Sequence, residues 1–156
     1  MGIISMFSDC GCGCKGGIAK KRFMISVLSA LVFYLIMNPF TFKATRGLFG
    51  PWISDSSGCP TFNGTLLHSV VYGIVIFALM LRPGSGGLPT FEKLKISVLS
   101  ALLFYIISSP NLFKFVNKKI GGWVSDPKGC PTPQGSLLHT MVFLLITYAM
   151  MNGKRI

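Results

Sequence analysis

The chain has 156 residues, of which 51% are hydrophobic and only 12% are charged, and its mean hydropathy is +0.61. A water-soluble domain carries about 25% charged residues, so too few are present here to cover a soluble globular surface. A net charge of +11 would indicate nucleic acid binding in a soluble protein. Here the bases flank apolar runs, which favours anionic lipid headgroups as partners and no nucleic acid. The composition predicts an integral membrane protein.

One stretch of the chain occurs twice. Residues 25–81 align without a gap on residues 96–152, and roughly half of the aligned positions are identical, which indicates an internal duplication. The predicted organisation is a Cys/Gly-rich basic head (1–22), repeat 1 (23–82), a Gly/Pro linker (83–91), repeat 2 (92–152) and a basic tail (153–156).

The head carries three cysteines, Cys10, Cys12 and Cys14. They lie just ahead of the basic residues 20–22 at a predicted membrane edge, a placement typical of S-palmitoylation. Gly2 is a candidate for myristoylation, although that pattern asks for Ser or Thr where this chain has Met6. The alternative is an unmodified head with reduced thiols.

Four apolar runs follow the head, at residues 23–37, 66–81, 94–107 and 137–151. Apart from Lys95, they contain no Asp, Glu, Lys or Arg, and each covers 14 to 16 residues. A hydrocarbon core about 30 Å thick needs about 20 helical residues, so each run is expected to need its flanks, a thinner bilayer or its neighbours. We therefore predict an all-α membrane protein with four short transmembrane helices.

Each repeat breaks at a proline, Pro39 or Pro110. Proline disfavours helix in the residue before it but suits the first position of the next helix. The segments that follow mix aromatic and basic residues, which predicts a short interfacial helix in each repeat. The expected interfacial anchors are Trp52, Trp123, Lys43 and Lys114. Thr65 and Ser136 are the predicted N-caps of the second span of each repeat.

Because each repeat contains two predicted spans, both repeats enter the membrane from the same side. They are therefore expected to be parallel two-helix repeats related by a pseudo-two-fold axis along the membrane normal. Nine bases lie around the head, linker and tail, and six lie in the segments within the repeats. The positive-inside rule then predicts a multi-pass protein with cytosolic termini.

Two Cys–His pairs occupy equivalent positions of the repeats, Cys59 with His68 and Cys130 with His139. The cysteines would form a disulfide in an oxidising compartment, or would remain separate thiols. Two Cys and two His also supply the ligands of a tetrahedral zinc site, although the spacing matches no familiar zinc pattern. The alternatives for the histidines are a neutral anchor at a helix start and a role in proton conduction.

Small residues recur at helical spacing in the first span of each repeat: Ser26, Ser29, Ala30, Ser97, Ser100 and Ala101. Such a stripe is typical of close helix packing in lipid, and the lining of a pore is the alternative. No carboxylate lies within an apolar run, and no phosphate loop or nucleophile–base pair is evident. We therefore expect neither an enzyme nor a cofactor.

The stretches ISVLSALLFYIISSPNLFKFVNKKIGGWVSDPKGCPT and GSLLHTMVFLLITYAMM resemble small tandem-repeat membrane proteins of large nucleocytoplasmic DNA viruses, including algal viruses. The most specific parts are three: the residues around Pro110, the segment 129–132 and the segment 137–139. The resemblance implies a structural protein, a scaffold of the virion membrane or a membrane-anchored capsid-associated component. Its expected location is the virion inner membrane or the host endoplasmic reticulum, with capsid proteins or further copies of itself as partners. A small oligomeric, viroporin-like channel is the alternative.

Overall fold

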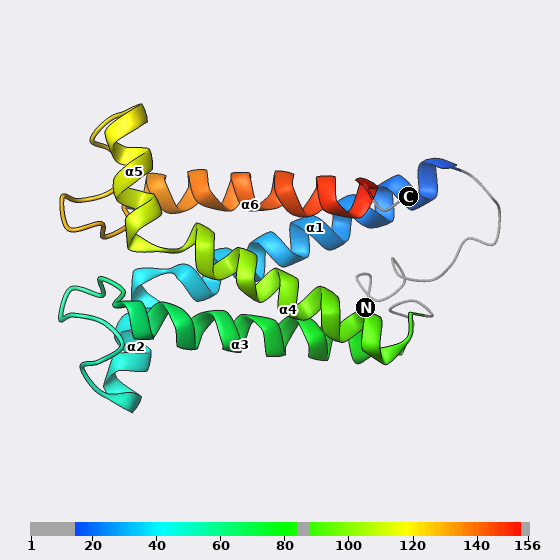
Figure 1. The fold of residues 1–156 in the computed structure, drawn as a ribbon, viewed down its shortest axis with the longest axis horizontal. Coiled ribbons are helices and arrows are strands. Elements are labelled where there is room, and N and C mark those ends of the chain that lie inside the picture. Colours follow the sequence, from blue (N-terminus) through cyan, green and yellow to red (C-terminus); the bar gives the residue numbers. More distant parts are fainter. Residues whose placement is uncertain (1–14, 84–87, 154–156) are drawn as a thin grey trace.

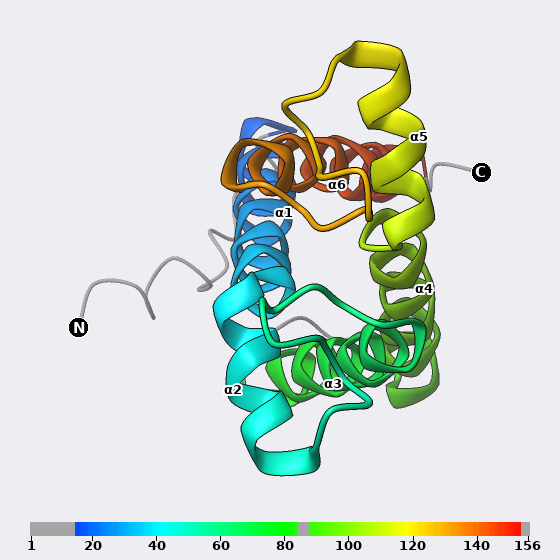
Figure 2. The same ribbon diagram turned by 90° about the vertical axis from the view of Figure 1, so that its left-hand side faces the viewer.

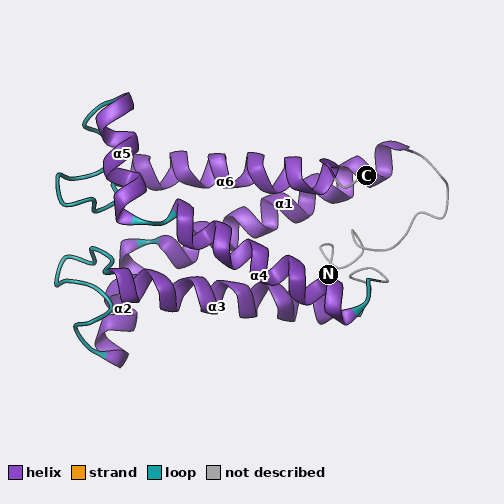
Figure 3. Cartoon of the chain, viewed as in Figure 1, coloured by secondary structure: helices purple, strands orange, loops and turns teal. Residues whose placement is uncertain are grey.

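The structure is a computed structural model that describes residues 15–83 and 88–153. The lipidation candidates Gly2, Cys10, Cys12 and Cys14 lie outside the described residues. Within these two ranges there are six helices and no strand (Figure 3), which confirms the prediction of an all-helical fold for this part of the chain. The helices are α1 (Lys15–Met37), α2 (Pro39–Phe49), α3 (Phe62–Leu81), α4 (Thr90–Ile107), α5 (Pro110–Ile120) and α6 (Pro133–Gly153).

Four long helices, α1, α3, α4 and α6, run along the molecule (Figure 1). The short helices α2 and α5 and the loops after them lie at one end, and the start of α1 and the end of α6 lie at the other. The closest packing pairs α3 with α4 and α1 with α6, whereas α1 touches α3 and α4 touches α6 much less. Figure 2 shows α2 and α5 leaving the bundle in opposite directions. The principal helix pairs therefore join residues 23–82 to residues 92–152.

The two prolines stand where the helix direction changes. Pro39 opens α2 after the N-cap Asn38, whose side chain accepts a hydrogen bond from the Phe40 amide, and Pro110 opens α5 after Ser109. The axis bends by 55° between α1 and α2 and by 53° between α4 and α5. A proline at the first helical position lacks an N–H that would have no helical partner there anyway. It therefore starts the short helix at no cost in hydrogen bonds.

The helices α3 and α6 begin earlier than predicted, so the assignment of Thr65 and Ser136 as N-caps is wrong. Thr61 Oγ1 accepts from the Gly64 amide, and Thr132 Oγ1 accepts from the Gly135 amide, both at 3.0 Å. Thr65 instead lies within the first turns of α3, where its hydroxyl donates to the Thr61 carbonyl at 2.9 Å. The turn-forming residues around Gly64 and Gly135 concealed these helix starts, because their composition resembles that of a loop.

Two helices, α3 and the 133–152 segment of α6, are each long and apolar enough to cross a membrane. The pairs α1/α2 and α4/α5 meet the same criteria only when each bent pair is counted together, which gives two to four candidate spans. The outward faces of the long helices carry large apolar side chains such as Leu35, Ile74, Ile106 and Leu145, each at least 58% exposed. Apolar helices with this exposure indicate a membrane-embedded protein.

The interior of the bundle holds both aromatic and polar side chains. Each long helix contributes one aromatic residue to its centre, and all four are fully buried: Phe33, Tyr72, Phe104 and Phe143. Ring centroids are separated by 4.4 Å for Phe33 and Phe143 and by 4.9 Å for Tyr72 and Phe104. Several buried hydroxyls bond within their own helices, as Ser26 does to the Arg22 carbonyl at 3.0 Å and Ser97 does to the Lys93 carbonyl at 2.9 Å. The Tyr72 hydroxyl instead donates to the Ser29 carbonyl of α1, and Ser136 Oγ is buried without a partner among the described residues. Self-satisfied hydroxyls remove the cost of burying a polar group.

Candidate functional site

The loops after α2 and α5 form matching tight turns. Within the first, the Asp55 amide donates to the Cys59 carbonyl and the Gly58 amide donates back to the Asp55 carbonyl, both at 3.1 Å. The second repeats both bonds, from Asp126 to Cys130 and from Gly129 to Asp126. Gly58 has a φ of +88°, and a Cβ there would lie 2.7 Å from the Pro39 carbonyl oxygen. Glycine is therefore required for the turn to rest on the start of α2.

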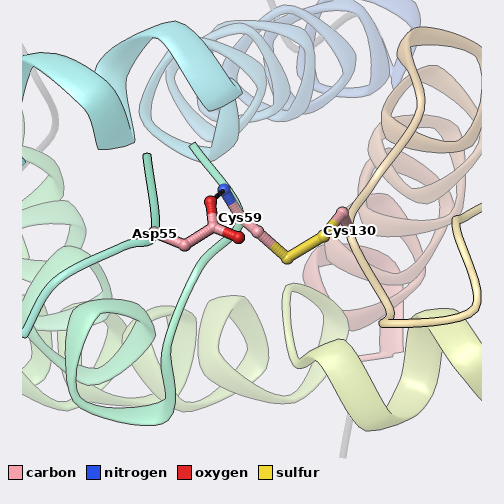
Figure 4. Close-up of side chains that lie close together, drawn as sticks. All are labelled: Asp55, Cys59 and Cys130. Carbon is pink, nitrogen blue, oxygen red and sulfur yellow. Dashed lines mark hydrogen bonds between the residues drawn. A yellow bond between two sulfur atoms is a disulfide. The ribbon is translucent and has the colours of Figure 1, made fainter. Parts of the chain in front are cut away.

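Cys59 and Cys130 are joined by a disulfide between these turns, with their Cα atoms 4.9 Å apart, although the two residues are 71 positions apart in sequence (Figure 4). Of the two arrangements that the sequence left open, the structure has the pair rather than two separate thiols. The bond links the loops that follow the two short helices, at the end of the bundle away from the start of α1.

The carboxylate of Asp55 orders the first turn. It accepts hydrogen bonds from the Ser57 hydroxyl, from the Ser57 amide at 2.8 Å and from the Cys59 amide at 2.9 Å. The Ser57 hydroxyl, together with these amides and the charge of Lys128, holds the pKa of Asp55 below its usual range. The turn that carries Cys59 is therefore braced by an ionised carboxylate at neutral pH.

The structure does not assemble the hypothesised zinc site of two cysteines and two histidines. Among the described residues, the cysteine sulfurs group with the Asp55 carboxylate, all within 4.8 Å of one another, and this group includes neither His68 nor His139. The sulfurs are bonded to each other, so they present no thiolate pair to a metal. The ring nitrogens of the histidines are directed elsewhere.

His68 forms a hydrogen bond with a backbone carbonyl in the last turn of α1. Its Nδ1–H donates to the Ile36 carbonyl at 3.0 Å, and its ring stacks on Phe42 at a centroid distance of 3.9 Å. The Ile36 carbonyl would pair with the Phe40 amide in a continuous helix, but that amide bonds to Asn38 Oδ1 instead. Because a carbonyl only accepts, Nε2 is left as an acceptor, and the Thr45 hydroxyl lies 3.0 Å away as its donor. The same hydroxyl also reaches the Thr41 carbonyl at 2.9 Å and the Phe42 carbonyl at 3.1 Å, so its one proton is shared among three acceptors. The buried ring therefore stabilises the bend between α1 and α2, which we call a helix joint.

His139 makes the same contacts in the second half, except that its Nε2 lacks the bond that His68 makes there. Its Nδ1–H donates to the Ile107 carbonyl at 2.8 Å, and its ring stacks on Phe113 at 3.7 Å. Among the described residues, nothing forms a hydrogen bond with its buried Nε2. The position equivalent to Thr45 is Val116, which has no hydroxyl to donate. Both histidines thus act in the helix joints, and one of them is incompletely satisfied.

The small-residue stripe lies partly in the tight helix contacts. Ser26 and Ala30 are buried on α1, and the Ser26 hydroxyl lies 3.7 Å from Met151 Sδ on α6. On α4, Ser97 is buried and Ala101 faces Gly73 of α3, where an added Cβ would lie 3.0 Å from the Ala101 Cβ. Ser29 and Ser100 are only half-buried. Sequence reasoning missed Gly73, although a glycine inside an apolar span is a signal for close helix approach.

The four expected anchors lie at the end of the bundle that carries α2 and α5. Trp52 and Trp123 are nearly half exposed, and the Trp52 ring N–H donates to the Phe49 carbonyl at 2.7 Å. Lys43 and Lys114 are exposed, and their aliphatic stems run beside Gly58 and Gly129. An apolar stem with a charged tip suits the boundary between lipid and water.

Fold and geometry together define an all-helical, membrane-embedded bundle with two helix joints and a disulfide at one end. No protein-family model, curated protein or solved structure matches the chain.

Proposed function

We propose that this protein is a structural membrane scaffold, and neither an enzyme nor a channel formed by one chain. The observation that carries the proposal is the aromatic cluster of Phe33, Tyr72, Phe104 and Phe143, which fills the bundle centre with fully buried rings. An ion path needs charged rings, carbonyls or a water-filled constriction along its axis. Four buried rings, stacked in two pairs that meet edge to face, offer none of these.

The scaffold is built as two parallel repeats related by a pseudo-two-fold axis, with α1, α3, α4 and α6 as spans and α2 and α5 at the interface. The matching turns, joints and histidine contacts of the two halves support this arrangement. A disulfide persists in an oxidising compartment, so the loop end faces the lumen or the exterior. The positive-inside rule independently assigns the start of α1 to the cytosol.

The resemblance to membrane proteins of large DNA viruses extends the proposal to a location and to partners. The membrane is then the virion inner membrane or host endoplasmic reticulum, and capsid proteins or further copies of the chain are the partners. A viroporin-like pore would have to be built between copies, since the centre of one bundle is filled.

Current recording in planar bilayers separates a scaffold from a pore. Purified, oxidised protein should give no unitary currents. The double variant S29A/S100A should also give none and should assemble as the wild type does. Reproducible currents that change with these two half-buried serines would refute the scaffold and establish a pore between copies.

Labelling in sealed vesicles tests the topology. One variant keeps Cys130 as its only cysteine, and another has a single cysteine in place of the exposed Lys20. A membrane-impermeant maleimide should label the two from opposite faces. Labelling of both from the same face would exclude the parallel arrangement.

A further inference from the structure

The short helices α2 and α5 occupy equivalent places but present different outward faces. Their inward faces match, because Phe42 and Phe113 are both buried against a histidine ring. The last turn of α2 ends in Leu48, 81% exposed, and Phe49, 59% exposed. The equivalent positions on α5 are the exposed Lys119 and Ile120, and Lys118 replaces Gly47.

The bases of α2 and α5 are also used differently. Arg46 Nη1 donates to the Ser54 carbonyl at 2.6 Å, so this base of α2 holds its own loop. On α5 the equivalent residue, Asn117, holds the loop by accepting from the Val124 and Ser125 amides, each at 3.1 Å. Loop support therefore requires no base on the α5 side, and the lysines there remain exposed.

We propose that α5 and its loop form a binding surface for the headgroups of anionic phospholipids. The basic α5 face, as we call this surface, consists of the exposed side chains Lys114, Lys118 and Lys119. Lys128 in the following loop is also exposed, but its charge acts on the Asp55 carboxylate. With Lys128 included, residues 110–132 carry four bases against one carboxylate (net +3), whereas residues 39–61 carry two bases against one carboxylate (net +1). The matching α2 surface instead enters the bilayer through its apolar last turn.

The surroundings of the basic α5 face suit a headgroup region. Phe115 is 59% exposed and lies below Lys119, whose Nζ is 6.0 Å from its ring centroid, and Trp123 after α5 is 46% exposed. Mixed aromatic and basic surfaces settle at the membrane interface. A base next to an anionic membrane strengthens binding about fivefold, and salt screens the attraction within a Debye length of about 8 Å at 0.15 M. The inference rests on the proposed membrane embedding and adds a lipid class and a location to it.

Lipid titration of the oxidised full chain in neutral detergent tests the inference, with native mass spectrometry to count bound phosphatidylglycerol and phosphatidylcholine. The wild type should prefer phosphatidylglycerol, and this preference should weaken as salt rises. In the triple variant K114Q/K118Q/K119Q, the preference for phosphatidylglycerol should fall at least about tenfold. The matched control K20Q/R82Q/K93Q removes the same charge at the other end and should retain it. Equal losses in both variants, or no preference in the wild type, would overturn the proposal.

A gain-of-charge variant tests the same idea from the opposite direction. The double variant G47K/L48K places the α5 charges on α2, and a Cβ at Gly47 meets no atom within 4 Å. It should bind additional phosphatidylglycerol, and an unchanged number of bound lipids would contradict the inference. Inorganic phosphate should compete poorly with phosphatidylglycerol for this surface. Displacement of the lipid by equimolar phosphate would show an anion site that does not recognise lipid, and would also overturn the proposal.

Carbonate extraction of membranes distinguishes the two proposals. The wild type and K114Q/K118Q/K119Q should both resist extraction. Release of the wild type would refute the membrane scaffold itself, whereas a retained wild type without lipid preference would refute only the headgroup surface.

Discussion

His68 and His139 show how one side chain closes a helix joint. Each donates to a carbonyl near the end of a long helix and stacks on the phenylalanine of the short helix that follows. Around the histidine ring the two joints differ where Thr45 provides a hydroxyl and Val116 does not. An unmade bond to a buried polar atom costs about 1–3 kcal/mol, so the second joint is expected to be the weaker one.

Replacing Val116 with Thr should stabilise the protein. The new hydroxyl would donate to His139 Nε2, as Thr45 does to His68, and a satisfied buried hydrogen bond contributes about 0.5–1.5 kcal/mol. The reciprocal change Thr45→Val should destabilise the protein by about 1–3 kcal/mol. Thermal unfolding of both variants in the same detergent measures the two effects, and a stabilising Thr45→Val would contradict this account of the joints.

At the scale of the elements, glycines let helices and loops approach one another. A Cβ at Gly64 would lie 1.9 Å from the Ile53 carbonyl oxygen, and a Cβ at Gly135 would lie 1.9 Å from that of Val124. The starts of α3 and α6 therefore rest directly on the backbone of the preceding loops. This contact also explains why both repeats carry a glycine here, after Asn63 in the first and after Gln134 in the second.

Alanine at Gly64 or Gly135 should severely destabilise the protein, because the loop backbone must move to admit the methyl group. A loss of at least about 3 kcal/mol is expected for either variant, near the upper end of typical substitutions. The control Gly47→Ala lies in a helix with open space around it and should be neutral or stabilising by up to about 1 kcal/mol. Chemical unfolding in detergent supplies the comparison, and tolerance of Gly135→Ala would disprove the close contact.

The contact between α3 and α4 depends on Gly73. The equivalent residue of α6 is Leu144, so the two close helix pairs are not identical. Gly73→Leu should force α3 away from Ala101 and lower the unfolding temperature by several degrees, since overpacking costs about 1–3 kcal/mol. The neighbouring control Ile74→Leu changes an outward side chain that is 62% exposed and should have little effect. Equal unfolding temperatures for the two variants would contradict the packing role of Gly73.

At the scale of the whole molecule, the two halves are interlocked. The closest helix pairs, α1 with α6 and α3 with α4, each join one half to the other. The aromatic cluster takes one ring from each long helix, and the disulfide closes the loop end. Neither half can bury its helices alone, so the bundle is expected to unfold as one unit.

Removal of the disulfide should lower stability without changing the fold. The variant C59S/C130S opens a covalent link between residues 71 apart in sequence, and loops of this length contribute about 2–4 kcal/mol when closed. The helix content should remain, because the helix pairs do not depend on the bond, while the unfolding temperature should fall. Circular dichroism during heating reports both quantities. Unchanged stability, or loss of helix at low temperature, would contradict this role.

The prediction from sequence succeeded where the signal was local. Few charged residues and four apolar runs indicated membrane helices, and the described chain is all-helical with two to four candidate spans. Pro39 and Pro110 marked helix breaks because proline restricts its own backbone and that of the residue before it. The predicted N-caps lie four residues after the true ones. Gly64 and Gly135 are typical of turns in sequence, and only the structure shows that they are helical residues packed on the preceding loops.

The sequence by itself determined the membrane class, the duplication and the places where the helices bend. Only the tertiary structure decided which helices pair, that Cys59 bonds to Cys130, and that the histidines hold carbonyls rather than a metal. The physical reason is the range of the interactions. Hydropathy and backbone restriction act within a few residues, whereas helix pairing and side-chain bonding depend on distances that exist only after long segments have packed together.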